Sequence, residues 1–72
     1  HLINYELLEN RIVITTPIPI QNKLSLFSLD GKTINPKVDI LNDSYYSIDI
    51  SDLPDGKYIL LYNRSLICKF IK

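Results

Sequence analysis

The sequence predicts an all-β fold, a small antiparallel immunoglobulin-like β-sandwich of about seven strands in Greek-key order. Three observations predict it. Short segments alternate between apolar and polar residues, turn-forming residues separate them about every 8–12 positions, and no segment has the clear periodicity of an amphipathic helix. The chain has 72 residues, of which 46% are hydrophobic, as is normal for a folded protein. We expect residues 1–72 to form a single domain.

The first strands are predicted from β-branched residues. Residues 3–8 fit a helix or a strand equally well, because so short a segment shows no clear period. Residues 11–16 are rich in Ile, Val and Thr, which favour strands. Pro17 and Pro19 are expected to end this strand, because proline cannot donate a hydrogen bond to a neighbouring strand.

A hairpin is predicted in the middle of the chain. Residues 23–28 alternate in polarity, and Asp30-Gly31 follows them. This dipeptide favours a tight turn, because glycine adopts the positive φ angle that the turn requires. The return strand begins at residues 32–34, and Asn35-Pro36 interrupts it before it resumes over residues 38–41.

The next predicted strand has one apolar face. Tyr46, Ile48 and Ile50 share this face because side chains in a strand alternate with a period of two. The segment before it, Asn42-Asp43-Ser44, has the composition of a turn. Leu53 is expected to pack beneath the turn that follows the strand.

Two more strands complete the prediction. Pro54-Asp55-Gly56 is expected to form a turn, in which proline presets its φ angle and glycine adopts a conformation closed to other residues. Residues 57–62 are apolar on both faces, which predicts a central strand covered on both sides. Asn63-Arg64 is expected to reverse the chain tightly into a last strand over residues 65–71.

Charge and hydropathy argue against several classes of function. Eight basic and eight acidic side chains cancel, so the chain lacks the positive field that attracts nucleic acids or anionic lipids, and we expect no nucleic-acid partner. The longest apolar run, residues 58–62, is far shorter than the ~20 residues that span a membrane. No leader peptide is visible before His1, which suggests that the sequence is a fragment of a larger protein or carries a remnant of a tag.

The residues of catalytic and metal sites are not gathered in this sequence. A nucleophile needs a positioned base, and zinc needs several Cys or His ligands, but the chain has one histidine, His1, and one cysteine, Cys68. Gly31 and Gly56 are each explained by a turn, which argues against a phosphate-binding loop. We therefore predict no enzymatic activity, no catalytic or metal-binding residue and no cofactor. Cys68 is expected to be a buried apolar filler.

Three acidic residues recur at a spacing of three, and they raise the possibility of calcium binding. They are Asp49, Asp52 and Asp55. A calcium loop needs oxygen ligands at alternate positions, and Leu53 and Pro54 occupy the intervening ones. We expect instead that Asp52 and Asp55 accept hydrogen bonds from the backbone of the turn, while Asp49 is solvated.

The five tyrosines raise the possibility of a recognition surface. Tyr58 and Tyr62 flank an inward-facing leucine and are expected to belong to the core. Tyr5 and Tyr45 are the better candidates for contact with a ligand, although no other feature of the sequence converges on them.

Three segments of the chain resemble the C-terminal sorting domain of type IX secretion cargo in Bacteroidetes, the Por secretion system sorting domain. The resemblance covers about residues 10–72. Its segments are Leu24-x-Leu26-Phe27-Ser28-Leu29-Asp30-Gly31-Lys32, Ile48-Asp49-Ile50-Ser51-Asp52-Leu53-Pro54-Asp55-Gly56-Lys57-Tyr58-Ile59-Leu60 and the closing Lys69-Phe70-Ile71-Lys72. The residues that define its structural turn motif are Asp30, Gly31, Lys32, Leu53, Gly56 and Tyr58. Departures at residues 5–8 and 63–65 leave open whether the domain is removed after export or retained.

The resemblance implies a binding role in secretion. The domain would follow an N-terminal passenger in a larger secreted protein. Translocon and shuttle components would recognise it, and a sortase-like peptidase would attach the passenger to the cell surface after it crosses the periplasm and the outer membrane. The last strand would offer its edge to a partner, with Lys69, Phe70, Ile71 and Lys72 as the partner-binding residues. The alternatives are a generic immunoglobulin-like accessory or adhesion module of a cell-surface protein and, least favoured, an enzyme that acts alone.

Overall fold

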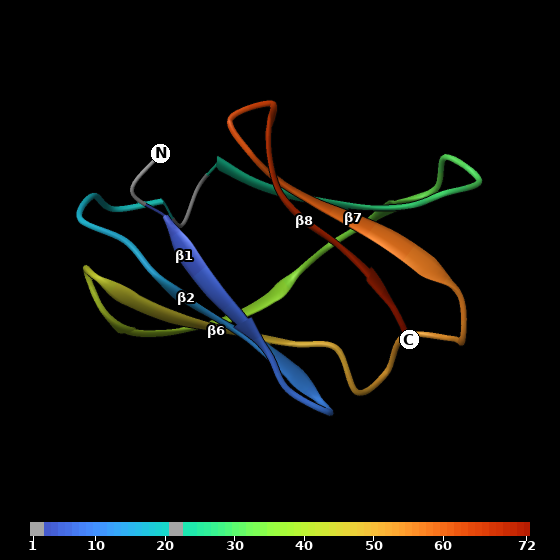
Figure 1. Ribbon diagram of the computed structural model, residues 1–72, viewed down its shortest axis with the longest axis horizontal. Coiled ribbons are helices and arrows are strands. Elements are labelled where there is room, and N and C mark those ends of the chain that lie inside the picture. The colour runs from blue at the N-terminus through green and yellow to red at the C-terminus, as the bar shows by residue number, and fades with distance from the viewer. Residues whose placement is uncertain (1–2, 21–22) are drawn as a thin grey trace.

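A computed structural model describes residues 3–20 and 23–72, which form two antiparallel four-stranded sheets packed face to face (Figure 1). The predicted all-β sandwich is confirmed, and these residues contain no α-helix. His1 lies outside the described residues. The strands are β1 (Asn4–Leu7), β2 (Arg11–Thr15), β3 (Leu24–Ser28), β4 (Thr33–Ile34), β5 (Lys37–Asn42), β6 (Tyr45–Asp49), β7 (Lys57–Tyr62) and β8 (Ser65–Ile71).

The structure has eight strands where the sequence predicted about seven. The difference arises at Asn35-Pro36, which was expected to interrupt one strand. Proline has no N–H to donate, and the chain leaves one sheet at β4 and enters the other at β5. The ambiguous segment at residues 3–8 contains β1.

Successive hairpins along the chain belong alternately to the two sheets. Sheet A has the order β1-β2-β6-β5, and sheet B has the order β4-β3-β7-β8. The inner neighbours β2 and β6, and likewise β3 and β7, are distant in sequence, as in Greek-key sandwiches. Strand β8 is an edge strand, hydrogen-bonded to β7 alone. Among the described residues, no helix has the length and apolar character needed to cross a membrane.

The core lies between the sheets and is built from alternate residues of each strand. Strands β2, β6, β7 and β8 each contribute two of its buried residues, and both predicted core tyrosines, Tyr58 and Tyr62, pack in or against it. Cys68 is only 3% exposed, as predicted, and its burial raises the pKa of its thiol to about 11. The buried core residues are Ile12, Ile14, Ile20, Leu26, Tyr46, Ile48, Ile50, Tyr58, Leu60, Cys68 and Phe70.

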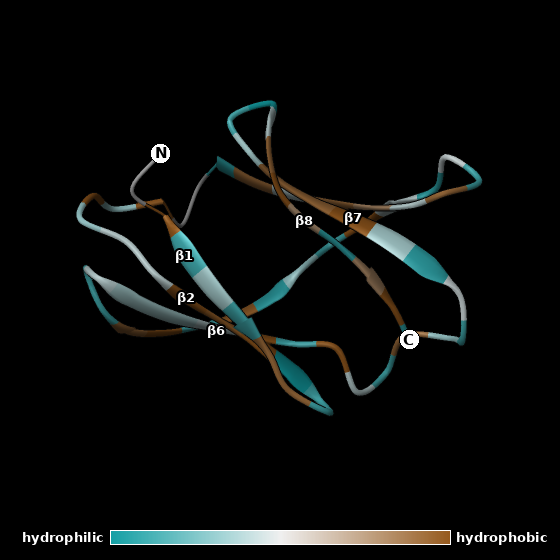
Figure 2. Cartoon of the chain, in the orientation of Figure 1, coloured by the Kyte–Doolittle hydropathy of each residue, from teal (hydrophilic) through white to brown (hydrophobic). Residues whose placement is uncertain are grey.

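Strand β7 lies at the centre of sheet B, between β3 and β8, but only one of its faces is covered. Tyr58 and Leu60 point into the core, whereas Ile59 and Leu61 lie on the outer face and are half-buried. The prediction that both faces are covered was wrong, because a two-layer sandwich has no third layer to pack on this side. Figure 2 shows brown, hydrophobic residues along much of β7.

Two tight turns occur where the sequence predicted them. Gly31 adopts a φ of 95° in the turn between β3 and β4. Asn63 and Arg64 adopt φ angles of 49° and 72° in the turn between β7 and β8, and two consecutive positive φ angles match the right-handed twist of a hairpin.

Candidate functional site

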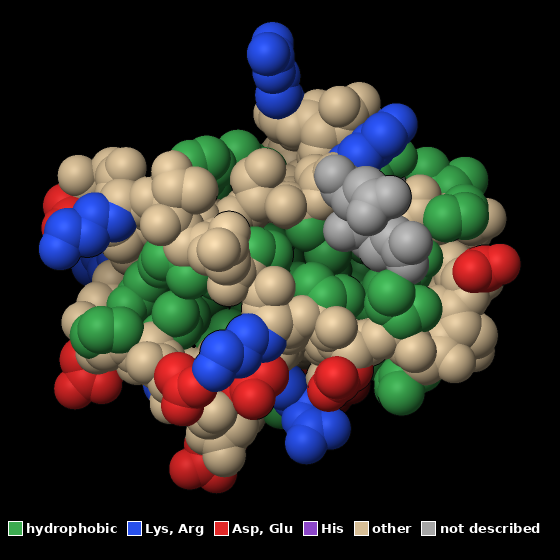
Figure 3. Space-filling model, turned by 180° about the vertical axis from the view of Figure 1, so that it is seen from behind, with side chains coloured by type: hydrophobic (Ala, Val, Ile, Leu, Met, Phe, Trp, Pro, Cys, Tyr) green, Lys and Arg blue, Asp and Glu red, His purple; other side chains and the backbone are tan. Residues whose placement is uncertain are grey.

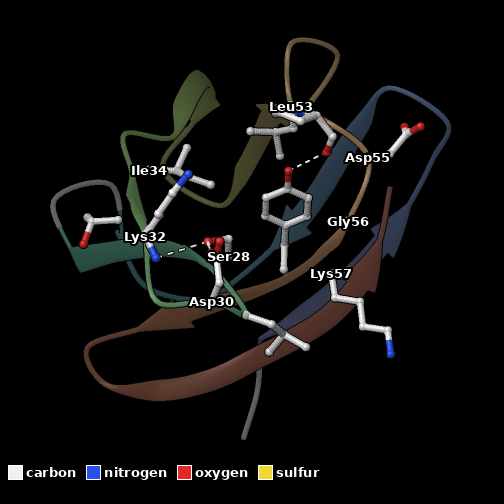
Figure 4. A pocket seen from close by; sticks show the side chains of 12 residues that line it. Ser28, Asp30, Lys32, Ile34, Leu53, Asp55, Gly56 and Lys57 are labelled. Carbon is white, nitrogen blue, oxygen red and sulfur yellow. Dashed lines mark hydrogen bonds between the residues drawn. The ribbon is translucent and has the colours of Figure 1, made fainter.

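The two turn motifs identified in the sequence lie at the same end of the sandwich. The first turn, Asp30–Lys32, joins β3 to β4, and the second turn, Leu53–Gly56, leads from β6 into β7. Residues of both turns line one groove (Figure 4). We therefore take this end of the domain, together with the adjoining end of β8, as the candidate functional site.

Hydrogen bonds around Ser28 hold the first turn. The N–H groups of Gly31 and Lys32 donate to the carbonyl and the hydroxyl of Ser28, at 3.0 and 3.1 Å. The Ser28 hydroxyl in turn donates to the carboxylate of Asp30, and this bond is the main cause that lowers the pKa of the Asp30 carboxyl. The acidic-Gly-Lys motif therefore specifies a turn, as expected, with its Lys32 side chain exposed.

Tyr58 holds the second turn. Its ring lies in the core and stacks on Phe70, with centroids 5.4 Å apart and planes 21° apart. Its hydroxyl donates a hydrogen bond to the carbonyl of Pro54 (Figure 4). Leu53 packs partly against the core, as predicted. Leu53, Gly56 and Tyr58 form a Leu-x-x-Gly-x-Tyr motif. Its leucine and its tyrosine ring both pack beneath the turn.

The second turn also holds the last residue of the sequence. The N–H of Lys72 donates to the carbonyl of Gly56 at 2.8 Å, and the N–H of Gly56 donates back at 3.2 Å. The Lys72 Nζ donates to the carbonyls of Ile50 and Ser51, at 2.9 and 3.3 Å. Gly56 has a φ of 157°, and a β-carbon there would make only an ordinary contact with Tyr58. Glycine is thus favoured at this position by backbone conformation and not by lack of space.

The acidic residues of this region only partly have the predicted roles. The carboxylate of Asp49 accepts hydrogen bonds from the hydroxyl and the N–H of Ser51, at 2.7 and 2.9 Å. Asp52 forms an ion pair with Lys37 of β5. No side-chain hydrogen bond is recorded for Asp55 within the described residues. Asp49 is exposed, as predicted, and in addition accepts hydrogen bonds within its own turn. The predicted bond from the turn backbone to Asp52 was wrong, because its carboxylate pairs with Lys37.

A metal site is not formed by these side chains. Within residues 3–20 and 23–72, no three His, Cys, Asp or Glu side chains lie close enough together to hold a metal ion. The carboxylate of Asp52 pairs with Lys37, and the carboxylate of Asp49 accepts a hydrogen bond from the N–H of Ser51. The spacing of three in the sequence thus does not translate into convergent ligands.

The Asp49→Asn variant is expected to lose less stability in acid than the parent chain. Hydrogen bonds from Ser51 lower the pKa of the Asp49 carboxyl below its ordinary value of 3.8. The stabilisation from this carboxylate is therefore present above about pH 4 and is lost as the pH falls through the folded-state pKa. Asparagine keeps an acceptor for Ser51 but cannot titrate. Urea denaturation between about pH 5 and pH 2 measures the difference, and equal acid slopes in the two proteins would contradict this role.

The groove between the two turns is open and largely apolar. It has a volume of about 540 Å³. Seen from behind, the molecule exposes green hydrophobic side chains within a hollow that has charged side chains around it (Figure 3). The apolar lining is formed by Leu29, Ile34, Leu53 and Pro54, and the charged residues of the lining are Asp30, Lys32, Asp55 and Lys57. Sequence reasoning did not find this groove, because it exists only where turns from different hairpins meet.

The four predicted partner-binding residues are consecutive at the end of β8 and the residue after it, but they do not form one surface. Lys69 is exposed and Ile71 is 72% exposed. Phe70, between them, is a core residue, 4% exposed. Lys72 is half-buried and bound to the second turn. Lys69 and Ile71 are thus the two whose side chains are accessible to a partner.

The two candidate tyrosines of sheet A do not converge either. Tyr5 is 48% exposed and Tyr45 is 40% exposed. Tyr45 pairs with Thr15, whereas Tyr5 pairs with the buried Ile14. Because residues paired across antiparallel strands share a face, the two tyrosines lie on opposite faces of the sheet and do not form one surface.

Comparison with known proteins assigns the chain to a family. A family model described as the secretion system C-terminal sorting domain matches residues 8–71, which is nearly the whole chain. Neither a comparison with curated proteins nor one with solved structures gave a match. The match includes both turns and the strand β8 as far as Ile71.

Proposed function

Because the chain belongs to the family of type IX secretion system C-terminal sorting domains, we propose that it is the C-terminal module of a larger protein and directs the export of the passenger that precedes it. A domain of this family marks a secreted or cell-surface protein, and the family is a sorting signal and not a class of enzyme. We propose further that the passenger crosses the outer membrane from the periplasm. Translocon and shuttle components would bind the domain, and a sortase-like peptidase would attach the passenger to the surface.

The segments that identify the family lie together at one end of the fold, and this observation supports the proposal. The family match extends through the two turns and β8. Residues of the two turns line one groove, and the pairing of Gly56 with Lys72 joins the second turn to the residue that follows β8. The segments that identify the family therefore form one end of a folded domain. A folded recognition element can present the same surface whichever passenger precedes it.

Strand β8 supports a contact with a partner in two ways. Its outer edge has no hydrogen-bonded neighbour in sheet B, and such an edge can accept a strand from another chain. Lys69 and Ile71 are both exposed on this strand, so we propose them as the residues that the machinery contacts most directly. In this proposal Phe70 and Lys72 contribute by holding the strand in place.

The test is the export of a reporter with a cleavable secretory leader, with and without residues 1–72 at its C-terminus, in a bacterium that has a type IX system. We expect the fused reporter at the cell surface or in the medium and the unfused reporter in the periplasm. Surface protein is measured by protease accessibility in intact cells. A fused reporter that stays in the periplasm, although folded, would contradict the proposed function. Export of the unfused reporter would also contradict it, and would leave an accessory or adhesion module as the better account.

A further inference from the structure

The outer face of sheet B, the face turned away from the core, is unusually apolar for a surface. The strand register defines its residues, because paired residues of neighbouring strands share a face. Phe27 pairs with Ile59, which pairs with Lys69, and Leu61 pairs with Leu66. The face consists of Phe27, Ile59, Leu61, Leu66 and Ile71, together with Ser25, Thr33, Lys57 and Lys69.

Its apolar side chains are partly accessible to solvent. Leu66 is 51% exposed and Ile71 is 72% exposed, while Phe27, Ile59 and Leu61 are half-buried. No described segment of the chain forms a layer over them. A contiguous apolar patch on a folded domain marks a surface that another molecule covers.

Sheet A provides an internal comparison. Its outer face carries the cross-strand row Arg11, Asp49 and Lys37, and the row Glu6, Val13, Ser47 and Asp39. The first row alternates in charge sign, and the second row places two carboxylates beside Val13 and Ser47. The same chain thus gives one sheet an outer face suited to water and gives the other sheet an outer face suited to contact.

The charges on the outer face of sheet B have one sign. Lys57 pairs with Ile71, and Ile59 pairs with Lys69, so the two lysines lie on adjacent strands, two residue positions apart along the ladder. The one ion pair that the structure records among the described residues joins Lys37 and Asp52 on the other side of the molecule. No carboxylate belongs to this face. A partner that brings carboxylates would complement it.

Charge also decides between the possible occupants. A second copy of this chain would bring the same two lysines to the contact, with no carboxylate to meet them. Binding to an anionic membrane would be favoured by about 1 kcal/mol for each lysine. Two lysines therefore give only a weak attraction, and the chain has no net positive charge to add to it. A protein surface can supply both an apolar patch and its acidic border.

We propose that the outer face of sheet B docks an apolar protein surface bordered by carboxylates, on a component of the secretion machinery. This inference rests on the proposed function and names the face and the chemistry of the contact. It extends the contact from Lys69 and Ile71 on β8 to Ile59 and Leu61 on β7 and to Phe27 on β3.

The test uses the exported reporter fusion with paired variants. Leu66→Ser/Ile71→Ser removes apolar surface from the face, and Leu41→Ser/Tyr45→Ser is the control at the β5–β6 hairpin of sheet A, where the two residues are 58% and 40% exposed. We expect about a tenfold fall in surface export for the first pair, as for the loss of a contact of ordinary strength, and export within about twofold of the parent for the second.

Charge variants test the second half of the proposal. Lys57→Glu/Lys69→Glu is expected to reduce export about tenfold, whereas Lys57→Arg/Lys69→Arg keeps the charge and is expected to export like the parent. Thermal unfolding of each purified 72-residue chain verifies that the variants are folded. If the Ser and the Glu variants were both exported at the level of the parent, the inference would be overturned and the proposed function would stand. If the parent fusion were not exported, both the inference and the proposed function would be contradicted.

The other two occupants give separate signals. Sedimentation of the parent chain that shows a dimer, lost in Leu66→Ser/Ile71→Ser, would overturn the inference in favour of a second copy. Flotation of the parent chain with phosphatidylglycerol vesicles, lost in the same variant, would overturn it in favour of a lipid surface. We expect a monomer that does not float.

Discussion

Replacement of Phe70 by alanine is expected to lower the free energy of unfolding by about 3–5 kcal/mol. Phe70 is 4% exposed and stacks on Tyr58 beneath the second turn, so the substitution leaves a cavity that the surrounding strands cannot fill. A chain of 72 residues is stable by only about 4–11 kcal/mol. The loss would therefore leave a domain close to its unfolding threshold, as urea denaturation can measure.

The neighbouring residue provides the matched control. Ile71→Ala on the same strand is expected to change stability by less than about 0.5 kcal/mol, because Ile71 is 72% exposed. The two variants separate the fold from recognition, since both residues were candidates for contact with a partner. Equal losses of stability in Phe70→Ala and Ile71→Ala would show that β8 does not pack as described.

Replacement of Lys72 by methionine is expected to lower stability by about 1–2 kcal/mol. Its Nζ donates to the carbonyls of Ile50 and Ser51, at 2.9 and 3.3 Å, and methionine has no donor for them. The backbone pairing with Gly56 is retained, so the variant isolates the side chain. Urea denaturation at neutral pH measures the effect.

Lys69→Met serves as the control for that variant, because it removes a lysine from β8, three residues before Lys72. Lys69 is exposed, and the structure records no hydrogen bond from its side chain within the described residues. We expect unchanged stability but reduced export of a fused reporter. A stability loss in Lys69→Met that matched the loss in Lys72→Met would contradict the division of the two lysines into a contact residue and a structural one.

Local sequence patterns predicted much of this fold. Asp30-Gly31 and Asn63-Arg64 specify turns through backbone conformations that few residue types adopt, and both turns occur where they were expected. The alternation of Tyr46, Ile48 and Ile50 identified a core face, and all three residues are buried. These features depend on neighbours in sequence, so the sequence alone contains their cause.

The features that sequence reasoning missed depend on tertiary contacts. The ion pair of Lys37 with Asp52 joins two segments that become neighbours only after β5 pairs with β6. The hydrogen bonds from Lys72 to the second turn depend on the pairing of β8 with β7. Residues 57–62 were expected to be covered on both sides because apolar residues indicate burial, whereas their outer face is only half-buried.

The most direct test of the central claim compares two hosts. The reporter fused to residues 1–72 is produced in a strain with a type IX translocon and in a strain that lacks it, and the surface-accessible fraction is measured in both. Our account predicts surface reporter in the first strain and a folded, periplasmic reporter in the second. The same surface fraction in both strains would contradict it.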